Sequence, residues 1–277
     1  MGAPEAWRGP YKALLARMRR GECIPMYYEP LSYEWIENST LDRALEIASV
    51  YDEAICVKKL APAPLLLLLE CLSEAQRVAP EIGYPGFEIV TNLQMNPDLV
   101  DWFTTVNRDP DEAPTVSGNI IVNDPTVCDI IRSTFPVLSR GMCWSHLLDG
   151  EREALAKTRE TQASYGQRGL PPAKYKRNWL RTGVRLHKYV NEMAPHLQVE
   201  DVLEAMDLSR CPAVSLKVDT YWQYARANKE PQRNDAIDLT LIAPQPYVDF
   251  SLIERRLAGF VEQSPLCQGS CSLPCAS

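Results

Sequence analysis

Apolar residues recur at helical spacing in several stretches of the chain. In Thr40–Ala54, Leu41, Leu45 and Ala48 fall on one face, which is typical of an amphipathic helix. The run LLLLLECLSEAQRV, which starts at Leu65, predicts a helix buried on almost every side, because five consecutive leucines leave no solvated face. Similar spacing, together with terminating Gly and Pro residues, predicts further helices. They are expected over Tyr11–Arg20, Cys143–Thr161, Lys174–Met193, Val199–Met206 and from the N-cap candidate Asn234 to Pro244.

Other stretches predict strands. Between Tyr247 and Ile253, the apolar residues Val248, Phe250 and Leu252 alternate with polar ones and would point to one face of a sheet. Shorter strands are expected at Ile24–Tyr28, Ile55–Val57 and Phe87–Val90. The chain is therefore expected to alternate helices with strands.

Composition indicates a globular protein. Its 277 residues are 45% hydrophobic and can bury a substantial core. No apolar run reaches the eighteen residues of a membrane span, and the first residues lack the apolar segment of a signal peptide, so we expect a cytoplasmic protein with no membrane partner. Six of the nine cysteines are scattered and are expected to be buried free thiols. Cys267, Cys271 and Cys275 lie in a tail that is expected to be disordered.

The net charge of −7 disfavours general attraction to nucleic acid, but the charge is segregated. From Arg152 to Lys188 there are ten basic and two acidic residues, so this segment carries +8 and the remainder −15. Aromatic residues interleave with these cations, a mixture that suits single-stranded RNA because cations contact phosphates and rings stack on bases. The alternative is an ordinary helix with a solvated basic side. The nucleic-acid-binding candidates are Lys174, Lys176, Arg177, Trp179, Arg181, Arg185 and Lys188.

Acidic residues near the C-terminus are the strongest candidates for chemistry, since neither a nucleotide-binding glycine motif nor a hydrolase nucleophile motif is present. Asp235 and Asp238 are three residues apart on one helix face, and Glu254 follows the predicted strand. In an open α/β sheet the carboxyl ends of the strands carry the ligand site. Acids gathered there would repel one another unless a divalent cation neutralised them. Alternatively, the helix acids complement the helix dipole and Glu254 begins a solvated turn.

The order Asp235, Asp238, then PQPYVD at Pro244–Asp249, then Glu254 resembles the C-terminal half of PIN-like nuclease domains, especially the longer bacterial ones. The resemblance covers about thirty residues. It implies that Asp235 and Glu254 hold Mg²⁺ or Mn²⁺ for cleavage of RNA, with Asp238 and Asp249 as further metal ligands. The family's last acid is more often Asp, and its first strand with an Asp has no counterpart here.

Two further acids enter through the same resemblance. PIN-like domains carry an acid on a central helix, and Glu70 is the candidate, because it directly follows the most apolar stretch of the chain. A carboxylate in such surroundings needs a partner or a metal, unless it lies on an exposed edge of the helix. Glu37 is the candidate for an additional acid after the first predicted strand, with Glu34 as the alternative; both are open to a simpler interpretation as surface glutamates.

The resemblance implies an α/β fold with a PIN-like parallel sheet flanked by helices. Residues 1–78 and 209–262 are expected to form the two halves of this domain, with a mainly helical insertion over 79–208 and a tail over 263–277. The implied function is a metal-dependent ribonuclease in which Glu70, Asp235 and Glu254 hold the cation that activates water. The alternatives are a catalytically inactive RNA-binding or scaffold protein and an all-helical interaction protein. Inhibition by a protein partner and the oligomeric state stay open.

Overall fold

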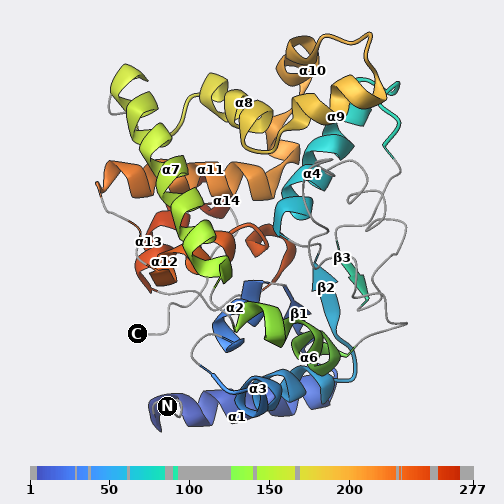
Figure 1. Ribbon diagram of the computed structural model, residues 1–277, viewed down its shortest axis with the longest axis vertical. Coiled ribbons are helices and arrows are strands. Elements are labelled where there is room, and N and C mark those ends of the chain that lie inside the picture. Colours follow the sequence, from blue (N-terminus) through green and yellow to red (C-terminus); the bar gives the residue numbers. More distant parts are fainter. Residues whose placement is uncertain are drawn as a thin grey trace. The chain divides into compact units, whose positions relative to one another are not determined.

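A computed structural model groups the chain into two compact units, each built from two separate stretches of sequence (Figure 1). The first unit combines Met1–Ala61 with Val90–Met142, and the second combines Pro62–Ile89 with Cys143–Ser277. The division of the chain into a two-part domain, an insertion and a tail stays a prediction. The structure describes residues 5–28, 30–36, 39–60, 63–84, 90–92, 126–139, 142–165, 169–228, 231, 233–249 and 255–268.

The described part of the first unit contains a small mixed sheet and four helices. Strand β2 (Lys58–Leu60) is the central strand: β1 (Met26–Tyr27) pairs with it in parallel, and β3 (Val90–Asn92) pairs with it antiparallel. The strands are too short to present a continuous apolar face, so the helices supply most of the core. These helices are α1 (Glu5–Arg19), α2 (Pro30–Ile36), α3 (Leu41–Asp52) and α6 (Val127–Leu138).

Helices α3 and α6 pack closely in this unit because α3 presents small side chains to its neighbour. Ala44 and Ala48 are fully buried in one cluster with Val127, Ile130 and Ile131 of α6. Methyl side chains let the larger residues of α6 approach and fill the interior without voids.

The end of α3 also determines where α6 begins. The carboxylate of Asp52, the last residue of α3, accepts hydrogen bonds from the backbone N–H groups of Val127 (2.8 Å) and Cys128 (3.1 Å). N–H groups in the first turn of a helix have no partner within that helix. Asp52 therefore caps α6 from a position seventy-five residues earlier in the chain.

The described part of the second unit is helical throughout, and the long helix α11 (Pro212–Arg226) is its most buried element (Figure 1). Twelve of the thirteen side chains from Ala213 to Ala225 are buried, all except Lys217. The other helices are α4 (Ala63–Val78), α7 (Met142–Tyr165), α8 (Ala173–Thr182), α9 (Leu186–Met193), α10 (Val199–Ala205), α12 (Arg233–Thr240), α13 (Arg255–Val261) and α14 (Pro265–Gln268), with 3₁₀ turns η2 (Leu208–Arg210) and η3 (Gln245–Tyr247).

Helix α11 contacts α4, α8 and α13, so its buried polar groups need partners within the unit. Asp219 is 1% exposed; Lys176 Nζ of α8 lies 2.6 Å from its Oδ1, and Ser264 Oγ donates a hydrogen bond of 2.8 Å to its Oδ2. Gln162 of α7 donates to the Trp222 carbonyl at 2.7 Å. These contacts satisfy polar groups that burial would otherwise penalise.

The α/β prediction is wrong. The described residues are mainly helical, and they contain one sheet whose three strands have two or three residues each, only two of them parallel. The strand expected over Tyr247–Ile253 was decisive for that prediction. In the described part of this segment, η3 ends at Tyr247 and no strand follows up to Asp249. Alternating apolar residues can form a strand only when a neighbouring strand satisfies the backbone, and the prolines at 244 and 246 instead favour a tight turn.

Most helix predictions are confirmed. The structure has α3 where Thr40–Ala54 was expected, α4 over the leucine run, α7 over Cys143–Thr161 and α10 over Val199–Met206. The single helix expected over Lys174–Met193 is instead two helices, α8 and α9, separated by residues 183–185. Arg185 in this break has φ of 57°, which a continuous α-helix excludes. No described helix combines the length and apolar character needed to cross a bilayer.

The cap on α6 can be tested by substitution. We expect Asp52→Ala to lower the free energy of unfolding by about 1–2 kcal/mol, because two first-turn N–H groups lose their acceptor. Asp52→Asn keeps one acceptor oxygen and should lose less. Urea denaturation of the three proteins measures the difference, and equal stability of Asp52→Ala and the parent would contradict the cap.

Candidate functional site

Glu70 lies at the centre of the second unit. The leucines before it are buried at 7% exposure or less, and Glu70 itself is 2% exposed, so it does not occupy an exposed edge of α4. Its Oε1 accepts a hydrogen bond from the Ala213 N–H (2.8 Å) and its Oε2 accepts one from the Val214 N–H (3.0 Å). The hydroxyl of Tyr247 donates a third hydrogen bond to Oε1. The predicted need for a partner is therefore met by a helix N-terminus and a tyrosine.

This arrangement caps α11. Cys211 stands at the N-cap position, and its side chain makes no capping hydrogen bond. Pro212 follows as the first helical residue and has no N–H to satisfy. The next two N–H groups point to the Glu70 carboxylate, whose negative charge also suits the positive end of the helix dipole. Glu70 thus replaces a local cap from another helix.

Burial and hydrogen bonding act on Glu70 in opposite directions. Burial raises the pKa of Glu70 above its ordinary value of 4.5, while the hydrogen bonds from Tyr247, Ala213 and Val214 lower it; burial is the larger effect. The pKa of Tyr247 is raised as well, first by burial and then by the Glu70 charge. Both groups therefore hold their protons more tightly than they would in water.

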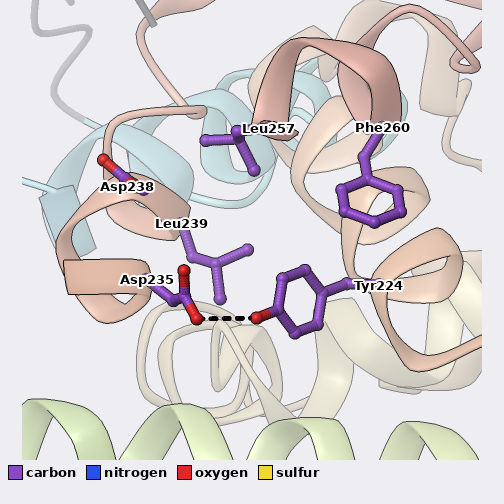
Figure 2. A pocket seen from close by; sticks show the side chains of 6 residues that line it. All are labelled: Tyr224, Asp235, Asp238, Leu239, Leu257 and Phe260. Carbon is purple, nitrogen blue, oxygen red and sulfur yellow. Dashed lines mark hydrogen bonds between the residues drawn. The ribbon is translucent and has the colours of Figure 1, made fainter. Parts of the chain in front are cut away.

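Asp235 and Asp238 lie in a separate place, a shallow depression that we call the α12 hollow (Figure 2). Asp235 is 2% exposed, and its Oδ2 accepts a hydrogen bond of 2.8 Å from the Tyr224 hydroxyl. In Figure 2 the Asp235 carboxylate turns toward Tyr224, whereas the Asp238 carboxylate points away from it. The lining side chains leave no room for a water molecule. They are Tyr224, Asp235, Asp238, Leu239, Leu257 and Phe260.

The structure does not bring Glu70 and Asp235 together. Glu70 binds α11 at Ala213, and Asp235 binds it at Tyr224, eleven residues further on. At 1.5 Å per residue, these points are about 16 Å apart along the helix. A cation with ligands at 2.0–2.6 Å cannot bridge that span. Glu70 and Asp235 are therefore too far apart to share the predicted Mg²⁺ or Mn²⁺ ion.

The other predicted acids do not complete such a site among the described residues. Asp249 is exposed just after η3 and does not line the α12 hollow. Glu254 and Glu37 lie outside the described residues. Within the described ranges, no group of three or more His, Cys, Asp and Glu side chains is placed to hold a metal ion.

Two of the predicted RNA-binding cations are engaged inside the second unit. Lys176 pairs with the buried Asp219. The guanidinium of Arg177 donates to the carbonyls of Leu203 (3.0 Å) and Glu204 (3.2 Å) near the end of α10. These contacts tie α8 to α10 and α11.

The remaining candidates differ in their surroundings. Arg181, on the exposed side of α8, pairs with Glu200 at 3.1 Å. Trp179 is half-buried and its ring lies against Gly183, where an added Cβ would come within 3.0 Å of it. Lys174, Arg185 and Lys188 are exposed, and none has a salt-bridge partner among the described residues.

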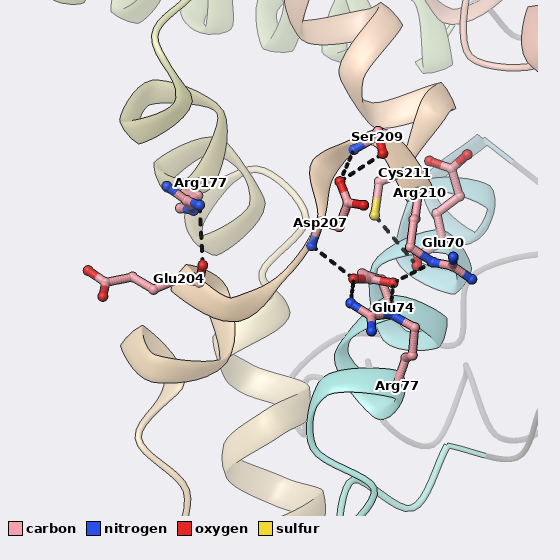
Figure 3. A network of polar contacts seen from close by, with 9 residues as sticks. All are labelled: Glu70, Glu74, Arg77, Arg177, Glu204, Asp207, Ser209, Arg210 and Cys211. Atoms are coloured by element: carbon pink, nitrogen blue, oxygen red, sulfur yellow. Dashed lines mark hydrogen bonds and ion pairs between the residues drawn. The ribbon is translucent and has the colours of Figure 1, made fainter.

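Sequence reasoning missed a second polar cluster on α4 (Figure 3). Glu74 is 3% exposed, and its carboxylate pairs with Arg77 of the same helix and with Arg210 of η2. It also accepts a hydrogen bond of 2.8 Å from the Asp207 N–H. The i, i+3 spacing of Glu74 and Arg77 was a signal in the sequence, but Arg210 is 136 positions from Glu74 and only the fold brings it near.

No family model, no curated protein and no solved structure matches this chain in the three comparisons made.

The Glu70 cap predicts a large effect on stability. We expect Glu70→Ala to lower the free energy of unfolding by roughly 2–4 kcal/mol, because two buried N–H groups and the Tyr247 hydroxyl lose their acceptor. Glu81→Ala, an exposed glutamate close to the end of α4, should change it by less than about 0.5 kcal/mol. Urea denaturation compares the two, and similar losses would contradict the cap.

The raised pKa of Glu70 predicts a pH dependence. Between pH 4.5 and the raised pKa, the folded protein binds more protons at Glu70 than the unfolded chain does, so stability falls as pH rises. Glu70→Gln cannot titrate and escapes this fall. The stability deficit of Glu70→Gln relative to the parent should therefore shrink as pH rises from 4.5 toward 7. Melting temperatures of both proteins across this range test it, and a deficit that grows with pH would contradict the shift.

Proposed function

We propose that this chain binds single-stranded RNA without hydrolysing it, through the exposed cations of α8 and α9. The observation that carries this proposal is the position of Lys174, Arg185 and Lys188. Lys174 lies on α8, Arg185 in the break before α9 and Lys188 on α9; all three are solvent-exposed, and their charges are free of ion pairs among the described residues. Exposed ammonium and guanidinium groups contact phosphates at little desolvation cost.

The break between α8 and α9 supports this role. Residues 183–185 separate the two helices, and the left-handed backbone of Arg185 starts α9 in a new direction. Lys174 of α8 and Lys188 of α9 therefore do not belong to one continuous helix. A flexible single strand can follow cations that are not set along one straight helix.

The acids argue for binding without hydrolysis. Glu70 caps α11 and Asp235 holds Tyr224, and the two lie about 16 Å apart along α11. Both therefore have structural roles that explain why a carboxylate is buried there. To form the predicted three-acid cation site, either Glu70 would have to leave the start of α11 or Asp235 would have to leave Tyr224.

Hydrolysis is retained as a second candidate because of one observation. Asp235 and Asp238 line the α12 hollow together with Leu257 of α13, and Glu254 precedes Leu257 by three residues in the sequence. Glu254 is therefore a third acid within three sequence positions of a residue that lines the hollow. Because the hollow has no room for a water molecule, a cation would have to be held outside it by Asp238 and Glu254, with Asp235 and Glu70 excluded; it would supply a metal-activated water.

RNA binding is tested by the anisotropy of a labelled single-stranded oligonucleotide over a range of salt concentrations. We expect the triple variant Lys174→Ala, Arg185→Ala, Lys188→Ala to bind more weakly, and the slope of log K against log salt to fall in magnitude by about 2, because each lost phosphate contact removes about 0.7. Lys157→Ala, an exposed lysine already paired with Glu153, is the matched control and should keep the parent slope. An unchanged slope in the triple variant would exclude α8 and α9 as the binding surface.

The same RNA, incubated with Mn²⁺ or with EDTA and run on a gel, separates the two candidates. Intact RNA in both lanes supports binding alone. Cleavage that needs Mn²⁺ and falls by about 100-fold or more in Asp238→Asn and Glu254→Gln, but persists in Asp249→Asn, would assign the hydrolytic function instead, because even outer contacts of a catalytic metal cost 10–100-fold.

A further inference from the structure

A second hollow, larger than the α12 hollow, opens between α4 and the start of α11. Its volume is about 540 Å³, within the range of small-molecule sites. We call it the arginine hollow, because Arg77 and Arg210 form two of its walls. Ser73 and Tyr247 also line it, and the Tyr247 hydroxyl reaches the buried Glu70 beneath. Three elements distant in sequence therefore converge on one space.

Both arginines are held in place by one buried carboxylate (Figure 3). Arg77 donates to Glu74 through Nε (2.8 Å) and Nη2 (2.6 Å), and Arg210 Nε lies 3.0 Å from Glu74 Oε2. The hydrogen bond from Arg77 is the main cause that lowers the pKa of Glu74 below its ordinary value, so this carboxylate stays charged. Fixing a guanidinium in advance removes part of the entropy cost of binding a ligand.

We call Glu74 with Arg77 and Arg210 the Glu74 clamp. It leaves most N–H groups of the two arginines available to a ligand. Each guanidinium carries five N–H donors. The described contacts use two of them on Arg77 and one on Arg210, and the two side chains remain 48% and 59% exposed. Paired N–H donors in a planar fork match the oxygens of a phosphate group.

The local charge balance sets the strength of binding. The two guanidinium charges are offset by Glu74 and by Asp207, whose carboxylate is turned toward Ser209 and accepts hydrogen bonds from its N–H (3.0 Å) and hydroxyl (2.7 Å). Attraction therefore comes from directed N–H donors more than from net charge. We therefore expect weak binding with little long-range steering.

The size and lining of the hollow favour a ligand larger than a free phosphate ion. Pro212 and the ring of Tyr247 provide apolar wall beside the arginines. A planar base can lie against an aromatic ring while the phosphate meets the guanidinium groups. We propose that the arginine hollow binds the phosphate of a nucleoside monophosphate, either free or at the 5′ end of an RNA strand. This site is independent of RNA contacts by α8 and α9.

The experiment is isothermal titration of the full chain in EDTA with AMP, adenosine, inorganic phosphate and citrate. AMP should bind, inorganic phosphate more weakly, and adenosine and citrate not measurably. Arg210→Ala should weaken AMP binding about tenfold or more, as expected for loss of hydrogen bonds to a charged group. Arg152→Ala, an exposed arginine in an i, i+3 pair with Asp149, is the matched control and should bind like the parent.

A second variant keeps the proposal testable if loss of Arg210 disturbs the Glu74 clamp. Ser73 is exposed and makes no hydrogen bond to Glu74, so Ser73→Asp adds a negative charge to the hollow without removing any group that pairs with Glu74. Its melting temperature should match the parent and its AMP binding should be lost. AMP binding by Ser73→Asp equal to the parent, no AMP binding by the parent, or equal binding of adenosine or citrate would each overturn the proposal.

The source of the phosphate is decided by a further titration with a short RNA carrying either a 5′-phosphate or a 5′-hydroxyl. A preference for the 5′-phosphate form over the 5′-hydroxyl form, lost in Ser73→Asp but kept in the Lys174, Arg185, Lys188 triple variant, assigns the end of an RNA strand. Binding of AMP that exceeds that of the phosphorylated RNA assigns a free nucleotide.

Discussion

The second unit depends on the contact between the Glu70 carboxylate and the first turn of α11. Helix α11 is buried over almost its whole length, so the N–H groups at its start cannot rely on water. Glu70 satisfies two of them from α4 and also accepts a hydrogen bond from Tyr247 of η3. One buried carboxylate thus joins three elements. Burial makes this arrangement costly when any partner is missing, which ties the folding of α4 to that of α11.

Other buried carboxylates of the second unit also have a partner within the unit. Asp219 is matched by Lys176, Glu74 by two arginines, and Glu151, also buried, accepts a hydrogen bond from Tyr221. Charged side chains that look like a basic surface or an acidic site in the sequence therefore serve as internal connections. Lys176 and Arg177 are used in this way, so the proposed RNA contacts are fewer than the basic segment suggests.

A feature of this structure can be predicted from the sequence when it depends on neighbouring residues, and not when it depends on residues far apart in the chain. The helical face of Thr40–Ala54 and the buried leucine run are local patterns, and both became helices. The strand expected over Tyr247–Ile253 does not form in its described part, up to Asp249, because strand formation depends on a neighbouring strand that no local pattern reveals. The burial of Glu70 could be predicted from the leucines before it. Its partners at Ala213 and Val214, more than 140 residues away, could not. Helix α11, the most buried helix of the second unit, was missed as an element because its buried residues occur on all sides and leave no periodic contrast.

Helix α11 also explains why two different sites can exist in one small unit. Its N-terminal end lies beside Glu70 and the arginine hollow, and its C-terminal half carries Tyr224 at the α12 hollow. The helix dipole favours negative charge at the first end and positive charge at the second. Glu70 already occupies the exact position of the cap, so an anionic ligand must bind beyond it, through the arginines. The separation of about 16 Å between the two ends keeps the phosphate site and the α12 acids from sharing one ligand atom, and each can therefore be altered without the other.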